Sequence, residues 1–500
     1  MSARGRDARA YTVAWWVVYV AACAGGLLLA AVARRNLFEP YLGVSLALLA
    51  LLLTCWLVGP RQSLYAALFL TAVSDRVTVA WFPFVKNLSS PESIAYVADG
   101  LSASPLDAAL ALGALVSVGR QWARHRRLVA PSSVSRALLV FMAMVAYGFL
   151  NGLVRGASVR LALIESRPVW YIGLVFVVAV NELTTTAHAR RAMWAIIAGV
   201  MVQSVLSIDF LRRLSPAERS ALEDLNEHGS AIGHNLVLFA LLAVVALGAG
   251  MAGHVSLLAI AAAPTAFVYA ISQRRAGFGA LVLAIALLAI VLYWHRRKVF
   301  WTLVPTTALL LAGYTAAFWN STGAIGFGAQ AVKSIVAPGS SSEADQASDL
   351  YRIIEAYDLN FTIRTSPIRG LGFGQPFYQP VALPPITDFE LSSYLPHNSI
   401  LWVWVKLGFV GFVAMFLLFG RALMSAGEWA RSSARDSDLV VTVLAASVVI
   451  MYATFTWYDI SWDARNTTFL GVALALCGRI RLDDAQRAQT ASTLPATKAA

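Results

Sequence analysis

The chain has 500 residues, of which 58% are hydrophobic and only 13% are charged, and its mean hydropathy is +0.66. Soluble proteins average about 25% charged residues. The composition therefore excludes a soluble enzyme, a nucleic-acid-binding module and a disordered protein, and it predicts an all-α polytopic membrane protein. The net charge of +12 is no sign of nucleic-acid binding, because basic cytoplasmic loops give any multispanning protein such an excess.

A hydrocarbon core about 30 Å thick requires about 20 apolar residues per helix, and about fourteen segments approach that length. They lie at residues 11–33, 41–58, 62–82, 105–120, 135–151, 168–180, 192–208, 233–250, 255–271, 277–294, 299–316, 397–420, 438–456 and 466–477. Some of these segments are short. The alternative to fourteen full spans is therefore about twelve full spans together with partial or tilted ones. The first segment starts like a signal peptide, but its length favours a retained signal-anchor.

Basic clusters recur at every second loop, before the first span, after the fourth, and at Arg190–Arg191, Arg296–Lys298 and Arg421–Arg435. They place both termini in the cytoplasm, with Arg34–Arg35 as an exception. The three cysteines, Cys23, Cys55 and Cys477, lie in or beside apolar segments and indicate no disulfide framework.

Four segments follow from this topology. They are an N-terminal transmembrane bundle (1–316), a long outward-facing loop (317–396), C-terminal transmembrane helices (397–477) and a disordered cytoplasmic tail (478–500). A loop as long as the second is uncommon unless it is functional or disordered. Within it, Asp349–Phe361 has helical spacing.

The topology places three histidines, His228, His234 and His397, on the outward face. No pair of them has zinc-ligand spacing with a third ligand nearby, so no metal site is predicted. His228, beside Glu227, is expected to be solvated. His234 opens a helix and is either a cap or, as the alternative, a ligand or catalytic group.

His397 lies in Leu395-Pro396-His397-Asn398-Ser399, where the long loop returns to the membrane. Pro396 and Asn398 fit a helix start, which directs a positive helix end toward whatever the loop encloses. An imidazole at such a place is either a general base or a capping residue, and the local sequence does not separate the two.

Outward-facing arginines recur at the membrane borders, although the positive-inside rule should deplete them. They are Arg155, Arg160, Arg167, Arg274, Arg275, Arg352, Arg364 and Arg369. Each alone is explained by a headgroup or a salt bridge, for example Arg352 with Glu355 at helical spacing. As a set, they indicate an anion site, and phosphate oxygens match the guanidinium fork.

The run Ser366-Pro367-Ile368-Arg369-Gly370-Leu371-Gly372-Phe373-Gly374, followed by LPHNSILWVWVKLGFVG at 395–411, resembles the bacterial O-antigen ligase and O-antigen polymerase superfamily. The matching motif residues are Pro367, Gly370, Gly372, His397, Asn398, Leu401, Gly408 and Gly411. The family's Ser-Arg-Gly turn is similar to Ser272–Gly277, where Gln273 intrudes, so either Arg274 or Arg275 is the counterpart. The glycines form a close-packed turn and not a dinucleotide fingerprint, because no strand precedes them.

The resemblance implies a GT-C-like, metal-independent, inverting glycosyltransferase without a cofactor, in the bacterial inner membrane with its active site on the periplasmic face. Its implied donor is an oligosaccharide linked to undecaprenyl diphosphate. The implied site has His397 as base and Arg167, Arg274, Arg275 and Arg352 around the diphosphate. The implied supporting residues are Arg369, Gly370, Gly372, Asn398 and Glu165, the last either orienting Arg167 or forming its salt bridge.

Three functions remain open. Polymerisation of O-antigen or exopolysaccharide repeat units is favoured, because the loop has no obvious device for engaging a bulky anionic core. A ligase that joins the polymer to a lipid-A core differs only in its acceptor. A transporter or flippase for lipid-linked sugars is the alternative from another class, but it typically shows internal repeats and midplane polar groups, and the chain shows neither.

Overall fold

The computed structural model describes residues 59–79, 82, 84–90, 102–221, 225–248, 252–272, 274–321, 326–337, 343–384, 391–433 and 436–493. Within these ranges every regular element is a helix, which confirms the predicted all-α class. The helices are α3 (Pro60–Val73), α4 (Pro105–His125), α5 (Ser135–Val154), α6 (Val159–Glu182), α7 (Thr186–Arg213), α8 (Pro216–Ala221), α9 (Ser230–Leu247), α10 (Ala252–Ser272), α11 (Arg275–His295), α12 (Arg297–Ala317), α13 (Phe327–Val336), α14 (Glu343–Thr365), α15 (Ser399–Ser432), α16 (Asp436–Phe455) and α17 (Ala464–Thr493).

Nine of the described helices are long and apolar enough to cross a membrane: α5, α6, α7, α9, α10, α11, α12, α15 and α16. Two more predicted segments, 105–120 and 466–477, lie within α4 and α17, and segment 62–82 is helical only as far as Val73, the end of α3. These three helices are not among the nine. Charged residues near its ends, such as Asp107 and Arg124, lower the hydropathy of α4. The predicted spans 11–33 and 41–58, with Cys23, Cys55 and Arg34–Arg35, lie outside the described residues.

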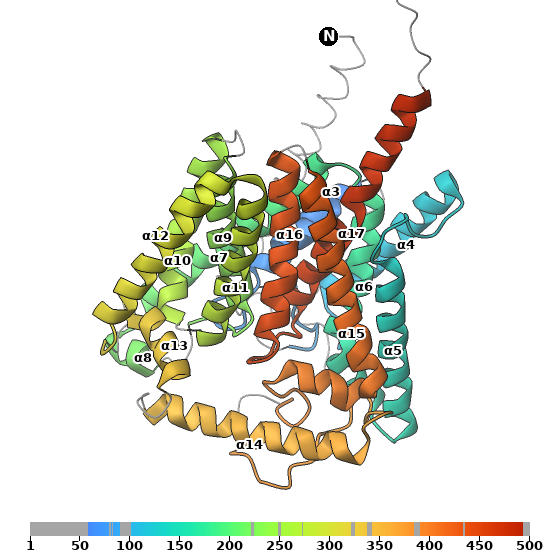
Figure 1. The fold of residues 1–500 in the computed structure, drawn as a ribbon. Helices are drawn as coiled ribbons and strands as arrows, with labels where there is room; N and C mark the ends of the chain where they lie inside the picture. The colour runs from blue at the N-terminus through green and yellow to red at the C-terminus, as the bar shows by residue number, and fades with distance from the viewer. Residues whose placement is uncertain are drawn as a thin grey trace, which may run out of the picture.

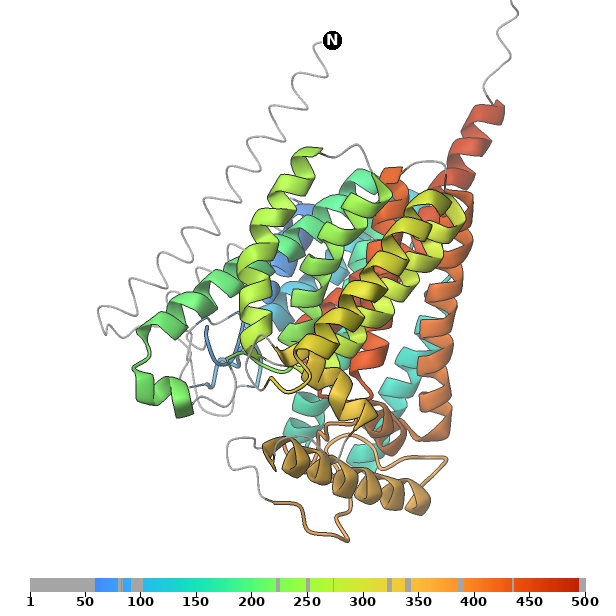
Figure 2. The ribbon, with the colours of Figure 1, turned by 60° about the vertical axis from the view of Figure 1, so that its left-hand side comes forward.

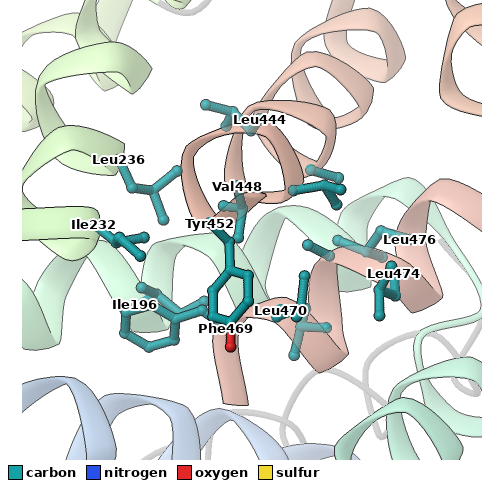
Figure 3. Packing of buried hydrophobic residues seen from close by; sticks show 14 of the residues in the cluster. Ile196, Ile232, Leu236, Leu444, Val448, Tyr452, Phe469, Leu470, Leu474 and Leu476 are labelled. Carbon is teal, nitrogen blue, oxygen red and sulfur yellow. The ribbon is translucent and has the colours of Figure 1, made fainter. Parts of the chain in front are cut away.

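The core of the bundle forms where α16 packs against α9, α11, α15 and α17. Most of α16 is buried, whereas α12 has no buried residue and lies at the edge of the bundle (Figure 1). Figure 3 shows Ile232, Val448, Tyr452 and Phe469 meeting at this centre. An all-round apolar helix such as α16 is expected to be enclosed by other helices.

The segment 317–396, predicted as a long loop, contains two helices. The helix expected at Asp349–Phe361 is confirmed as part of α14, which lies crosswise at one end of the bundle (Figures 1 and 2). Glu355 and Leu359 on α14 are buried, whereas Ile353 and Tyr357 are exposed. The end of the bundle that carries α14 is called the α14 end below.

The C-terminal segment differs from its prediction. Disorder was expected over residues 478–500, but α17 continues to Thr493 and projects from the end opposite α14 (Figures 1 and 2). Alanine and glutamine in this segment are good helix formers, and the preceding helical turns remove the cost of helix nucleation.

Helix α15 is broken at Gly408, whose φ is 70° and ψ is −176°. The break leaves the carbonyls of Val405 and Lys406 without their helical partners. The N–H groups of Leu371 and Gly372 donate to these two carbonyls at 2.6 and 3.1 Å. The N–H of Phe409 in turn donates to Pro367 O at 2.9 Å, so the predicted close-packed turn completes the backbone hydrogen bonding of the broken helix.

The same turn is clamped between α5, α6 and α15. Gly372 has a φ of +87°, and a Cβ there would lie 2.2 Å from the backbone nitrogen of Gly152 in α5. Gly374 donates its N–H to the buried carboxylate of Glu165 at 2.5 Å. The glycines at these positions are therefore required by both backbone conformation and close approach.

We expect Gly372→Ala to lower the free energy of unfolding by more than about 2 kcal/mol, since it adds positive-φ strain to a backbone clash. Gly420→Ala, in the middle of α15, is the control, because a Cβ at Gly420 meets no atom within 4 Å. The thermal unfolding midpoint of each variant in detergent measures the effect. Equal midpoints for the two variants would contradict this account of the turn.

Candidate functional site

His397 lies directly before α15, and its position is fixed by a carboxylate from α14. Asn398 is the N-cap of the helix, since its side chain accepts the N–H of Leu401 at 3.0 Å, which confirms the predicted helix start. Glu355 binds His397 twice: Oε1 lies 3.1 Å from the ring Nδ1, and Oε2 accepts the backbone N–H at 2.9 Å. An Nδ1–H donated to Glu355 leaves the Nε2 lone pair as the proton acceptor.

The expected salt bridge between Glu355 and Arg352 is wrong. Helical spacing predicted a salt bridge between Arg352 and Glu355, but Arg352 instead contacts Asp349, with Nη1 3.6 Å from Oδ1. The carboxylate of Glu355 is almost fully buried, with 2% of its side chain exposed. A buried carboxylate requires hydrogen-bond donors, and the His397 ring and backbone supply them.

Two further rings flank His397. Tyr351, one turn before Glu355 on α14, packs edge-on at 5.4 Å between ring centroids. Burial and the charge of Glu355 raise the pKa of Tyr351 to about 12, so its phenol stays neutral at physiological pH. The ring centroid of His228 lies 6.2 Å from that of His397 on the other side.

His228 is not simply solvated, contrary to the expectation from its charged loop. Its Nδ1 lies 2.7 Å from Oδ1 of Asp459, a residue between α16 and α17 whose side chain is 3% exposed. Burial alone would raise the pKa of Asp459, but His228, Arg274 and His397 together lower it to about 2. Asp459 is therefore an anion that contacts His228.

The turn between α10 and α11 carries Arg274 and Arg275, as predicted, and directs them to different partners. The guanidinium of Arg274 contacts both ring nitrogens of His228, at 3.4 and 3.3 Å, and donates to Asn226 O at 3.2 Å. Arg275 binds Asp349 through two nitrogens, at 2.9 and 3.4 Å. Because Asp349 also contacts Arg352, one carboxylate on α14 links two of the predicted arginines.

Arg167 and Glu165 do not form the pair that their spacing suggested. Glu165 makes a fully buried ion pair with Lys406 at 2.8 Å and accepts the indole N–H of Trp402 at 2.9 Å. Arg167 contacts Asp107 at 3.4 Å and donates to Asn87 Oδ1 at 2.5 Å. The contacts of Arg167 thus lie at the start of α4, and the structure does not bring Arg167 into the group around His397.

The other residues predicted for the site make contacts elsewhere than at His397. Arg369 is exposed in the glycine turn, and its carbonyl accepts a hydrogen bond from Asn151 at 3.4 Å. Gly370 packs against the break in α15, whereas Gly372 packs against α5 and donates its N–H to Lys406 O. His234 is buried inside α9 with its Nε2 3.0 Å from Gln203 Oε1, so it is neither a cap nor a group at the α14 end. Among the described residues, no group of three or more His, Cys, Asp or Glu side chains is placed to hold a metal ion.

Sequence reasoning missed the three acidic residues that organise the site, Asp349, Glu355 and Asp459. A weak signal existed for two of them: Glu355 shares a helical face with Tyr351, and Asp349 precedes Arg352 by one turn. The contact between His228 and Asp459 spans 231 positions of the chain, and no local pattern indicates it.

The model of the O-antigen ligase family matches residues 257–416. No curated protein matches the chain. The matched segment contains the arginine turn, Arg352, the glycine turn and His397, whereas Arg167 and Glu165 lie outside it. The match confirms the resemblance found in the motifs and supports a ligase or polymerase type of function. Residues 257–416 of this all-helical, multi-pass membrane protein are therefore similar to the O-antigen ligase family.

Proposed function

We propose that this protein is an inverting glycosyltransferase that moves a glycan from undecaprenyl diphosphate to an acceptor hydroxyl at the α14 end, on the periplasmic face of the inner membrane. The observation that carries the proposal is the His397–Glu355 pair. Arg274 is held by His228, the neighbour of His397, and Arg275 and Arg352 contact Asp349 on the helix that carries Glu355. A base and an anion site are the two components that such a transfer requires.

The proposed step is a single displacement at the anomeric carbon of the donor. Nε2 of His397 removes the proton of the acceptor hydroxyl as the oxygen attacks. The bond between the anomeric carbon and the diphosphate oxygen breaks, and the electron pair leaves with the lipid diphosphate. Glu355 stabilises the imidazolium that forms, and the arginines compensate the negative charge that develops on the leaving group, in place of a metal ion.

Arg352 has a hydrogen-bond donor available for a ligand. Nε of Arg352 is buried and, within the described part of the chain, has no hydrogen-bond partner. Arg275 and Arg352 both contact the carboxylate of Asp349. A diphosphate has more acceptor oxygens and more charge than one carboxylate, so it is the better partner for both arginines.

Among family functions, we propose polymerisation of O-antigen or exopolysaccharide repeat units. The test supplies the purified protein in nanodiscs with only its lipid-diphosphate-linked repeat unit and resolves the products by size. A ladder of longer lipid-linked glycans supports a polymerase. Elongation that begins only after addition of a lipid-A core supports a ligase, and absence of transfer to either acceptor argues against a glycosyltransferase.

His397→Ala should abolish transfer, since general-base catalysis contributes about 10²–10⁴-fold. Glu355→Gln keeps an acceptor for Nδ1–H but removes the charge that stabilises the imidazolium, so we expect a smaller loss in kcat. His125→Ala, an exposed histidine at the end of α4, is the control and should retain activity. Full transfer by His397→Ala would exclude His397 as the base.

Arg352→Lys should reduce transfer, because an ammonium group does not reproduce the planar fork of the guanidinium. We expect about a tenfold fall in kcat/KM, corresponding to one lost charge-assisted hydrogen bond. Arg364→Lys, on an exposed part of the same helix, is the matched control. If the two variants turn over donor equally well, Arg352 has only a structural role.

Asp349→Asn should lower the KM for the lipid-diphosphate donor, since the native carboxylate occupies the two arginines that we assign to the diphosphate. The expected change is about threefold or more, given the modest strength of partly exposed ion pairs. Donor titrations of the variant and the wild type measure it. A raised KM would instead show that Asp349 orients the arginines for binding.

A further inference from the structure

His228 lies where the loop before α9 meets the turn before α11. Nη1 of Arg274 is 3.4 Å from its Nδ1 and 3.3 Å from its Nε2. Because Cε1 lies between these two nitrogens, an atom in the ring plane at nearly equal distances from both would collide with Cε1. Nη1 therefore lies over the face of the imidazole, where a cation is attracted by the π-electrons of the ring.

The ring itself is fixed from behind. Its Nδ1 is 2.7 Å from Asp459 Oδ1, and the same oxygen accepts the backbone N–H of Ile460 at 2.8 Å. Asp459 is buried, so its orientation is set by the connection between α16 and α17. The carboxylate also offsets the positive charge of Arg274.

Arg274 is held a second time by the same loop, since its Nη2 donates to Asn226 O at 3.2 Å. One nitrogen thus rests on the His228 ring, and another is bound by a backbone carbonyl two residues before that ring. This arrangement fixes the guanidinium against His228, whose ring centroid lies 6.2 Å from that of His397.

We propose that His228 is a positioning residue: its ring, fixed by Asp459, is the platform that holds Arg274 beside His397 for the diphosphate of the donor. The inference rests on the proposed function, because it assigns Arg274 to the diphosphate. In this proposal His228 acts through Arg274 and not by proton transfer.

Substitutions at position 228 separate the two contacts of the ring. His228→Phe keeps a planar face for Arg274 but loses the hydrogen bond to Asp459. His228→Asn keeps a donor near the position of Nδ1 but removes the face. The measured quantity is the Kd of the full-length protein in nanodiscs for undecaprenyl diphosphate, a probe that requires no transfer.

We expect His228→Asn and His228→Ala to raise the Kd about tenfold, in the range of a partly desolvated cation–π contact, whereas His228→Phe stays within about threefold of the wild type. In an Arg274→Ala background, His228→Ala should add no further loss, since it acts through the missing arginine. His228→Phe leaves Asp459 without its histidine partner and can unfold for that reason. The comparison of the Arg274→Ala variant with the double variant then still tests the inference.

Losses that add in the double variant would overturn the inference, as would wild-type binding by His228→Asn together with weak binding by His228→Phe. A wild-type protein that binds the lipid diphosphate with this pattern but transfers no glycan would leave the inference standing and remove the proposed function. A wild-type protein that does not bind the lipid diphosphate would remove both.

Discussion

The break in α15 is the constraint on which the geometry of the site depends. Carbonyls in a membrane have no water to bind, so those that a break releases must be satisfied by protein. In this chain the N–H groups of Leu371 and Gly372 satisfy the carbonyls of Val405 and Lys406. The turn that carries these groups is therefore fixed to the break, and the first turns of α15, preceded by His397, are held near α14.

A buried ion pair holds the same region from the opposite side. Lys406 and Glu165 are fully buried, and removal of one charge would leave the other without compensation. Gly374 and Trp402 donate the remaining hydrogen bonds to Glu165. The glycine motif thus supports the region that precedes α15, and the residues to which we assign the chemistry are His397, Glu355 and the arginines that α11 and α14 contribute.

The sequence predicts most of what is local in this protein. Apolar runs locate the nine described helices that are long and apolar enough to cross a membrane, Asn398 marks the start of α15, and the arginine turn separates α10 from α11. The sequence-based prediction fails where partners are distant in the chain. Glu355 contacts His397, 42 positions away, and not Arg352, and Glu165 contacts Lys406 and not Arg167. Spacing along one helix reports only neighbours on that helix, whereas burial selected these partners from other helices.

The residues of the site span almost half of the chain, from His228 before α9 to Asp459 after α16. The site therefore has a natural order of assembly. When synthesis has passed α15, the imidazole of His397 and the carboxylate of Glu355 are both present, but the anion that orients His228 is still missing. The proposed site therefore has its complete set of charges only after α16 and the connection that carries Asp459 are in place, so a partly inserted chain lacks the complete site.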